Sequence, residues 1–87
     1  MNLPAKTESD TLNKAINIMY LLCIGLTMPQ VCAELGYTRN AINGFLRRAR
    51  LLYKVENNET MLVLMLTAKQ IKLGPLLEEI QNRSQEN

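Results

Sequence analysis

Histidine is absent from this 87-residue sequence, and only two cysteines occur. The lack of histidine removes the usual acid–base residue and the commonest metal ligand, and two cysteines alone do not form a zinc site. We therefore expect no enzymatic activity, no metal and no cofactor. Cys23 and Cys32 each lie within an apolar helical pattern, which indicates reduced core residues of a cytoplasmic protein rather than a disulfide.

Long hydrophobic runs are also missing. The longest uninterrupted run, residues 18–24, is far shorter than the roughly 20 residues that a helix needs to cross a bilayer. The first ten residues contain no hydrophobic signal core, so we expect a soluble cytoplasmic protein with no membrane partner. With 47% hydrophobic and 21% charged residues, residues 1–87 have the composition of one small globular domain.

Acidic residues are absent from one segment in particular. Between Thr38 and Val55 the sequence has five cations and no anion. Residues 1–37 sum to −1 and residues 56–87 to −2, so the overall charge of +2 conceals this segregation. A basic segment flanked by acidic ones is typical of a surface that contacts nucleic acid.

The basic segment belongs to a pattern that predicts a helix-turn-helix over residues 27–52. Thr27 opens a capping box, and Pro29 fits the first turn of the helix that follows. Gly36 supplies the left-handed residue that ends this helix, and Thr38 can cap a second one. Two short helices joined by about three to four residues form the geometry that places a second helix in the major groove of DNA.

The second helix separates its residue types by side. With successive residues about 100° apart, the apolar residues fall within about 140° of arc. These apolar residues are Ala41, Ile42, Phe45, Leu46, Ala49 and Leu52. The opposite side, about 100° wide, carries Arg39, Asn40, Asn43, Arg47 and Arg50. An ordinary solvated face or a contact with an acidic protein partner would also account for a polar side.

Arginine and asparagine suit DNA recognition because arginine pairs with guanine and asparagine with adenine, each through two hydrogen bonds. We expect base contacts from Arg39, Asn40 and Asn43, near the start of the helix, and phosphate contacts from the later cations. The full set of predicted DNA-binding residues is Thr38, Arg39, Asn40, Asn43, Arg47, Arg48, Arg50 and Lys54.

A further helix is predicted before this unit. Asp10 or Thr11 can cap it after a lead of residues 1–9, and Gly25 can end it. Its predicted buried stripe consists of Leu12, Ala15, Ile16, Met19, Leu22 and Cys23. Residues off that stripe are also apolar, namely Ile18, Tyr20 and Leu21. They indicate a helix that is covered on more than one side.

Residues 53–66 allow two interpretations. A β-hairpin that turns at residues 57–58 would produce a winged helix-turn-helix. A small wing shows one face to water, however, whereas residues 61–66 are apolar on both alternating faces. We favour a fourth helix from about Asn58 to Leu73, with one side on the core and the other on a partner subunit.

The predicted dimer contacts of this helix are Met61, Leu62, Leu64 and Met65, within an expected dimerisation region at residues 58–83. Gly74 and Pro75 should break or kink the chain after it. A short last helix should follow, with Leu76, Leu77 and Ile80 on its apolar side.

From Gly25 to Met61 the chain resembles the C-terminal DNA-binding domain of LuxR-type regulators, the group that includes stand-alone GerE and the NarL-like response regulators. The matching residues are Gly25, Leu26, Thr27, Val31, Cys32, Leu35, Gly36, Thr38, Ala41, Ile42, Tyr53, Val55 and Asn57. Lys54 stands where the family usually has glycine, and Asn58 where it commonly has arginine. The resemblance implies a four-helix fold, a third helix in the major groove and a fourth helix that forms a dimer. Similar spacing also occurs in the C-terminal helix-turn-helix of sigma factors.

The sequence thus predicts an all-α, LuxR/GerE-like helix-turn-helix domain of four to five helices, with the winged form as the alternative. The expected function is sequence-specific binding of double-stranded DNA by a homodimeric transcriptional regulator. The alternative is a protein-interaction module derived from a helix-turn-helix, such as an anti-activator or a partner of RNA polymerase.

Overall fold

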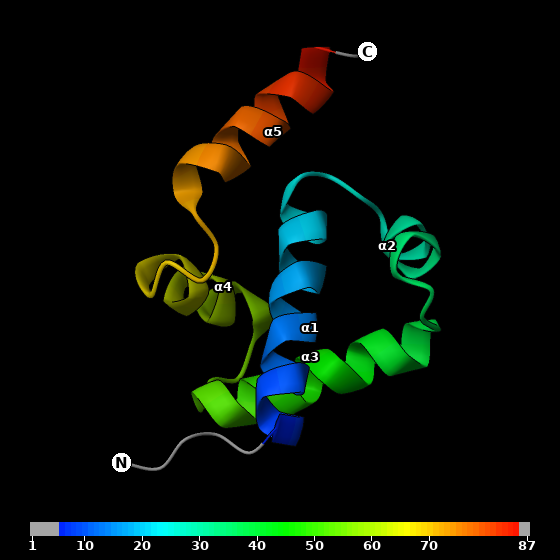
Figure 1. The fold of residues 1–87 in the computed structure, drawn as a ribbon, viewed down its shortest axis with the longest axis vertical. Coiled ribbons are helices and arrows are strands. Elements are labelled where there is room, and N and C mark those ends of the chain that lie inside the picture. The colour runs from blue at the N-terminus through cyan, green and yellow to red at the C-terminus, as the bar shows by residue number, and fades with distance from the viewer. Residues whose placement is uncertain (1–5, 86–87) are drawn as a thin grey trace.

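The computed structural model describes residues 6–85, which form five α-helices (Figure 1). They are α1 (Lys6–Cys23), α2 (Met28–Leu35), α3 (Arg39–Tyr53), α4 (Asn58–Thr67) and α5 (Leu73–Gln85). No strand occurs within these residues. The predicted all-α fold is therefore confirmed, and the winged alternative with a hairpin at residues 53–66 is wrong.

Helix α1 is the centre of the arrangement (Figure 1). It packs against α2, α3 and α5, while α3 also packs against α2 and α4. The core that these contacts form consists of Ala15, Ile18, Met19, Ile24, Val31, Ile42, Leu46, Ala49, Met61, Met65, Ile71 and Leu76. Because three helices cover α1, it is buried on more than one side, as predicted. Ile18, predicted to lie off the buried stripe, is fully buried.

The start of α1 differs from the prediction. The helix begins at Lys6, so neither Asp10 nor Thr11 caps it, and the part of the expected lead that the structure describes, residues 6–9, is helical. Thr11 is buried within the helix instead. Glu8 lies in the first turn, where a carboxylate stabilises the positive end of the helix dipole. Asp10 and Thr11 are able to cap a helix, but they do not prevent a helix from beginning before them.

Helix α4 begins at the predicted residue but ends at Thr67, before the expected Leu73. Lys69 adopts a left-handed conformation with φ 60°, and the Gln70 N–H donates to the Met65 carbonyl at 2.8 Å. This hydrogen bond closes the last turn and stops the helix.

The expected break at Gly74 and Pro75 is wrong. Both residues lie near the start of α5, where the missing N–H of proline has no cost. On α5, Leu76 is buried and Ile80 is half-buried, but Leu77 remains 49% exposed.

Candidate nucleic-acid interface

The turn between α2 and α3 is built by its capping residues. The Gln30 N–H donates to the Thr27 hydroxyl at 3.4 Å, and the Thr27 N–H donates to the Gln30 side-chain oxygen at 2.8 Å, which completes the predicted capping box. Gly36 ends α2 in the left-handed conformation, with φ 73°. Three residues, 36–38, separate the two helices. The predicted pair of short helices with a tight turn is therefore present.

Thr38 fixes the start of α3. Its hydroxyl accepts a hydrogen bond from the Ala41 N–H at 3.1 Å, and its carbonyl accepts from the Ile42 N–H at 3.0 Å. A capping threonine stabilises a helix by about 1 kcal/mol. The side chain predicted to bind DNA is thus a helix cap at the edge of the candidate interface.

Arginine and asparagine side chains form the polar side of α3. Arg39, Asn40, Asn43 and Arg47 are all exposed. A shallow hollow of about 320 Å³ on this side is lined by Asn40, Asn43, Gly44, Arg47 and Arg50. Helix α3 has no acidic residue, so this surface presents donors and positive charge without an internal counter-ion on the helix. We call this surface, Arg39, Asn40, Asn43 and Arg47, the α3 polar face.

Arg50 lies beside the α3 polar face but has a partner within the protein. Its side chain is half-buried, and its Nη1 donates to the Asn58 Oδ1 at 2.6 Å. The neighbouring Asn57 caps α4, because its Oδ1 accepts from the Thr60 N–H at 2.8 Å. Arg50, predicted to contact phosphate, therefore joins the end of α3 to the start of α4.

Arg48 is on another side of α3. Nine residues after Arg39 it is rotated by about 180°, and its guanidinium carbon lies 5.2 Å from the centre of the Phe45 ring. The Lys14 ammonium lies 4.8 Å from the same ring centre, and Tyr37 meets the ring edge-on. Arg48 thus takes part in a cluster between α1 and α3 and does not belong to the α3 polar face.

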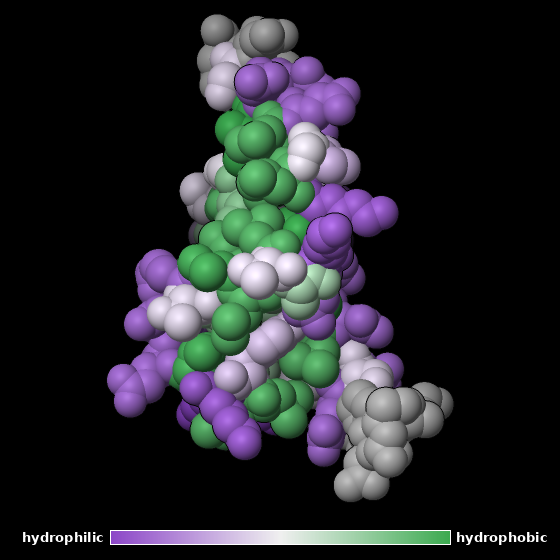
Figure 2. All heavy atoms as spheres, turned by 90° about the vertical axis from the view of Figure 1, so that its left-hand side faces the viewer, coloured by the Kyte–Doolittle hydropathy of each residue, from purple (hydrophilic) through white to green (hydrophobic). Residues whose placement is uncertain are grey.

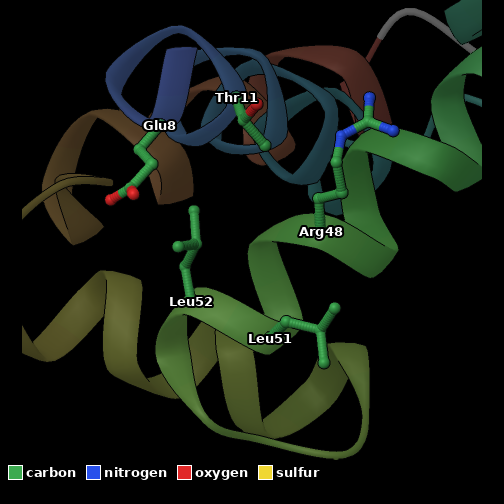
Figure 3. A pocket seen from close by; sticks show the side chains of 5 residues that line it. All are labelled: Glu8, Thr11, Arg48, Leu51 and Leu52. Atoms are coloured by element: carbon green, nitrogen blue, oxygen red, sulfur yellow. The ribbon is translucent and has the colours of Figure 1, made fainter. Parts of the chain in front are cut away.

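An apolar hollow of about 230 Å³ lies next to Arg48. Its lining residues are Glu8, Thr11, Arg48, Leu51 and Leu52. Figure 3 shows Arg48 and Leu52 rising from α3 toward α1, where Glu8 and Thr11 lie. Leu51 is 73% exposed, which is unusual for a leucine, and sequence periodicity did not single it out.

Lys54, the last predicted phosphate contact, is exposed directly after α3. It has φ 61°, in the left-handed region that favours glycine. The lysine therefore occupies a backbone position that glycine would occupy without strain. The ammonium group is available to a phosphate beside the end of α3.

Two of the four predicted dimer contacts belong to the core. Met61 and Met65 are fully buried, so neither side chain is available to a second subunit. Leu62 is half-buried and Leu64 is 37% exposed. Val63, which was not predicted as a contact, is 59% exposed.

Neither of the two cysteines forms a disulfide. Cys23 and Cys32 are both free and half-buried, and burial raises the pKa of the Cys23 thiol. Within residues 6–85, no three His, Cys, Asp or Glu side chains gather as metal ligands. Over the same residues, no helix combines the length and the apolar character that crossing a membrane requires.

Comparison with models of known protein families finds no match, and comparisons with curated proteins and with solved structures also find none.

Proposed function

We propose that this protein is a sequence-specific regulator that binds double-stranded DNA as a homodimer, with α3 as its recognition helix. The observation that carries the proposal is the α3 polar face: four exposed arginine and asparagine side chains on a helix without acidic residues. Such side chains hydrogen-bond to base edges in the major groove and to phosphates. The three-residue turn before α3 supports it, because this connection is typical of DNA-binding helix pairs. The protein acts by binding alone, without catalysis or a cofactor.

The two ends of the α3 polar face have different roles in this proposal. Arg39 and Asn43 lie in the first half of α3, where base contacts concentrate in helix-turn-helix proteins. Arg47 lies one turn after Asn43, and Lys54 follows the helix, so both suit phosphates. Arg50 joins α3 to α4, and Arg48 lies on another side of α3 against Phe45, so neither is assigned to DNA.

The test compares a selected duplex with random duplex DNA. Asn43→Ala should cost about 1–3 kcal/mol on the best sequence recovered by in vitro selection, with little change on random DNA. Lys54→Ala should weaken binding to both duplexes by the same factor and serves as the matched phosphate variant. If the Asn43 variant also loses the same factor on both duplexes, Asn43 does not read bases. If the wild-type chain binds no duplex at low salt, the proposal is wrong.

A second function, binding to another protein such as RNA polymerase, is favoured by the apolar hollow beside Arg48. Leu51 and Leu52 expose apolar surface there, next to the guanidinium group. In this case Leu51→Glu should abolish partner binding in a pull-down with purified polymerase, and Asn43→Ala should have no effect. This alternative is excluded if the wild-type chain binds DNA at physiological salt and Leu51→Glu leaves the amount of polymerase in the pull-down unchanged.

A further inference from the structure

The four glycines of the chain differ in whether the backbone requires them. Gly25 and Gly36 have positive φ angles of 108° and 73°, which favour glycine over residues with a β-carbon. Gly74 lies in the first turn of α5, and an added β-carbon would meet no atom of the described residues within 4 Å. Gly44 lies inside α3 without a positive φ. Its identity as glycine therefore needs a different explanation.

Packing within the subunit does not require glycine at position 44. Apart from residues 43 and 45, the nearest side-chain atom to a β-carbon at this position would be the Arg48 Nη1, at 3.5 Å. This distance is an ordinary van der Waals contact, so alanine would fit beside the guanidinium group. Glycine in a helix interior is less stable than alanine, because it loses more conformational freedom on folding. The fold would thus gain from alanine, which indicates that the missing side chain serves the surface of α3.

The surface around Gly44 is the hollow in the α3 polar face. Residues at positions i, i+3, i+4 and i+7 are neighbours on one side of a helix. In α3 these residues are Asn40, Asn43, Gly44 and Arg47. Gly44 is buried, whereas the other three are exposed. Together with Arg50 they line the hollow of about 320 Å³, so Gly44 lies at its floor, with longer polar side chains around it.

The polar groups around the hollow match the edge of an adenine base. An asparagine amide offers one donor and one acceptor, which pair with the N7 acceptor and the N6 donor of adenine in the major groove. Arginine offers donors only, which suit guanine or a phosphate oxygen. Arg50 is already bonded to Asn58, and Arg47 suits a phosphate. The asparagines are therefore the groups that are free to bind a base inside the hollow.

We propose that Gly44 is a specificity-determining residue, which lets the major-groove edge of an adenine enter the hollow and pair with Asn43. This inference rests on the proposed function and names a base that the α3 polar face reads. A β-carbon on Gly44 would extend about 1.5 Å from the helix backbone beside the base. A displacement of that size breaks hydrogen bonds, because they weaken beyond about 3.2 Å between donor and acceptor.

The first experiment applies two measurements to Gly44→Ala. The melting temperature should rise by about 4 °C, because alanine stabilises the interior of α3. Fluorescence anisotropy should show an affinity for the selected duplex that is lower by about tenfold. Affinity for random duplex DNA should change by less than about twofold, because that binding depends on phosphates. A glycine with a merely structural role would not produce higher stability together with weaker sequence-specific binding.

Gly74→Ala is the matched control, since it makes the same change in another helix. Figure 2, which looks onto the side of α4 and α5, shows hydrophobic atoms along this side. On α5, Leu73 and Leu77 are 55% and 49% exposed. Exposed leucines do not suit the phosphates of DNA, so Gly74→Ala should bind both duplexes like the wild type.

The second experiment replaces each adenine of the selected duplex in turn with 7-deazaadenine, which lacks the N7 acceptor. At one adenine the replacement should weaken wild-type binding by about tenfold. At the same adenine it should weaken binding of Gly44→Ala by less than about twofold, because that variant has already lost the contact.

The inference is overturned if the two proteins lose the same factor at every adenine. It is also overturned if Gly44→Ala binds the selected duplex as tightly as the wild type does, although the wild type still prefers that duplex to random DNA. A wild-type chain that binds no duplex at low salt overturns the proposed function itself, and this inference with it.

Discussion

Arg47 and Arg48 are adjacent in the sequence, but the structure places them on different sides of α3. Arg47 is exposed on the α3 polar face, whereas Arg48 lies against the Phe45 ring. If α3 enters the major groove through its polar face, the two arginines should contribute unequally to the salt dependence of DNA binding. Arg47→Ala should reduce that dependence, and Arg48→Ala should leave it nearly unchanged.

The size of the effect follows from the number of available cations. Arg47 and Lys54 are the exposed cations assigned to phosphate in each subunit, which gives four in a dimer. At about −0.9 per neutralised phosphate, the slope of log K against log salt is about −3.6. Arg47→Ala removes two of the four cations and should bring the slope to about −1.8. Between about 50 and 200 mM salt, the wild type should lose roughly 150-fold in affinity and the variant roughly 10-fold.

Fluorescence anisotropy with a labelled random duplex measures these slopes directly. Arg48→Ala is the matched control, and its folding is checked first because it loses a cation–π contact of about 0.5–1 kcal/mol. Equal slopes for the wild type and the Arg47 variant would refute the assignment of the α3 polar face. A slope lowered only by Arg48→Ala would place the nucleic acid on the opposite side of α3.

Three further predictions concern stability. Met65→Ala should lower the free energy of unfolding, measured by urea denaturation, by about 2–5 kcal/mol. Leu64→Ala should lower it by less than about 1 kcal/mol, because only Met65 is fully buried. Similar losses in the two variants would mean that α4 turns a different side to the core. Lys54→Gly should raise the free energy of unfolding by about 1 kcal/mol, because glycine adopts the left-handed backbone conformation of Lys54 without strain. A decrease would show that the backbone at Lys54 is not strained. Burial raises the pKa of the Cys23 thiol and that of the Tyr53 hydroxyl above their ordinary values, so the stability gained by keeping both groups neutral is fully present at neutral pH. It is lost as the pH rises through the raised pKa values. Urea titrations from pH 7 to 11 should show this loss, and it should be smaller in Cys23→Ala; an unchanged loss would exclude the thiol as a cause.

The turn between α2 and α3 could be predicted from sequence because its capping signals are local. Thr27, Gly36 and Thr38 each act on backbone groups within four residues, so their roles do not depend on distant packing. The orientation of α4 could not be predicted in the same way. Residues 61–66 are apolar on every side of a helix, so periodicity does not distinguish Met65, which is buried, from Leu64, which is partly exposed.

The candidate interface was also predictable only in part. The exposed residues of the α3 polar face follow from a 100° rotation per residue, which needs no knowledge of the tertiary fold. The roles of Arg48 and Arg50 do need it. Arg48 packs on Phe45 next to Lys14 of α1, and Arg50 bonds to Asn58 of α4. Charge counted along the sequence therefore overestimates the number of cations on the α3 polar face.

The end of α3 is joined to both ends of α4. Arg50 bonds to Asn58 at the start of α4, and the Tyr53 hydroxyl bonds to the Gln70 side chain just beyond its end. These two hydrogen bonds resist rotation of α3 relative to α4. If α4 lies at the contact between the subunits of the proposed homodimer, the two recognition helices would be held at one separation. Such a dimer would require inverted half-sites at a single spacing, and inserting about five base pairs between them, half a helical turn, would abolish binding of both subunits at once.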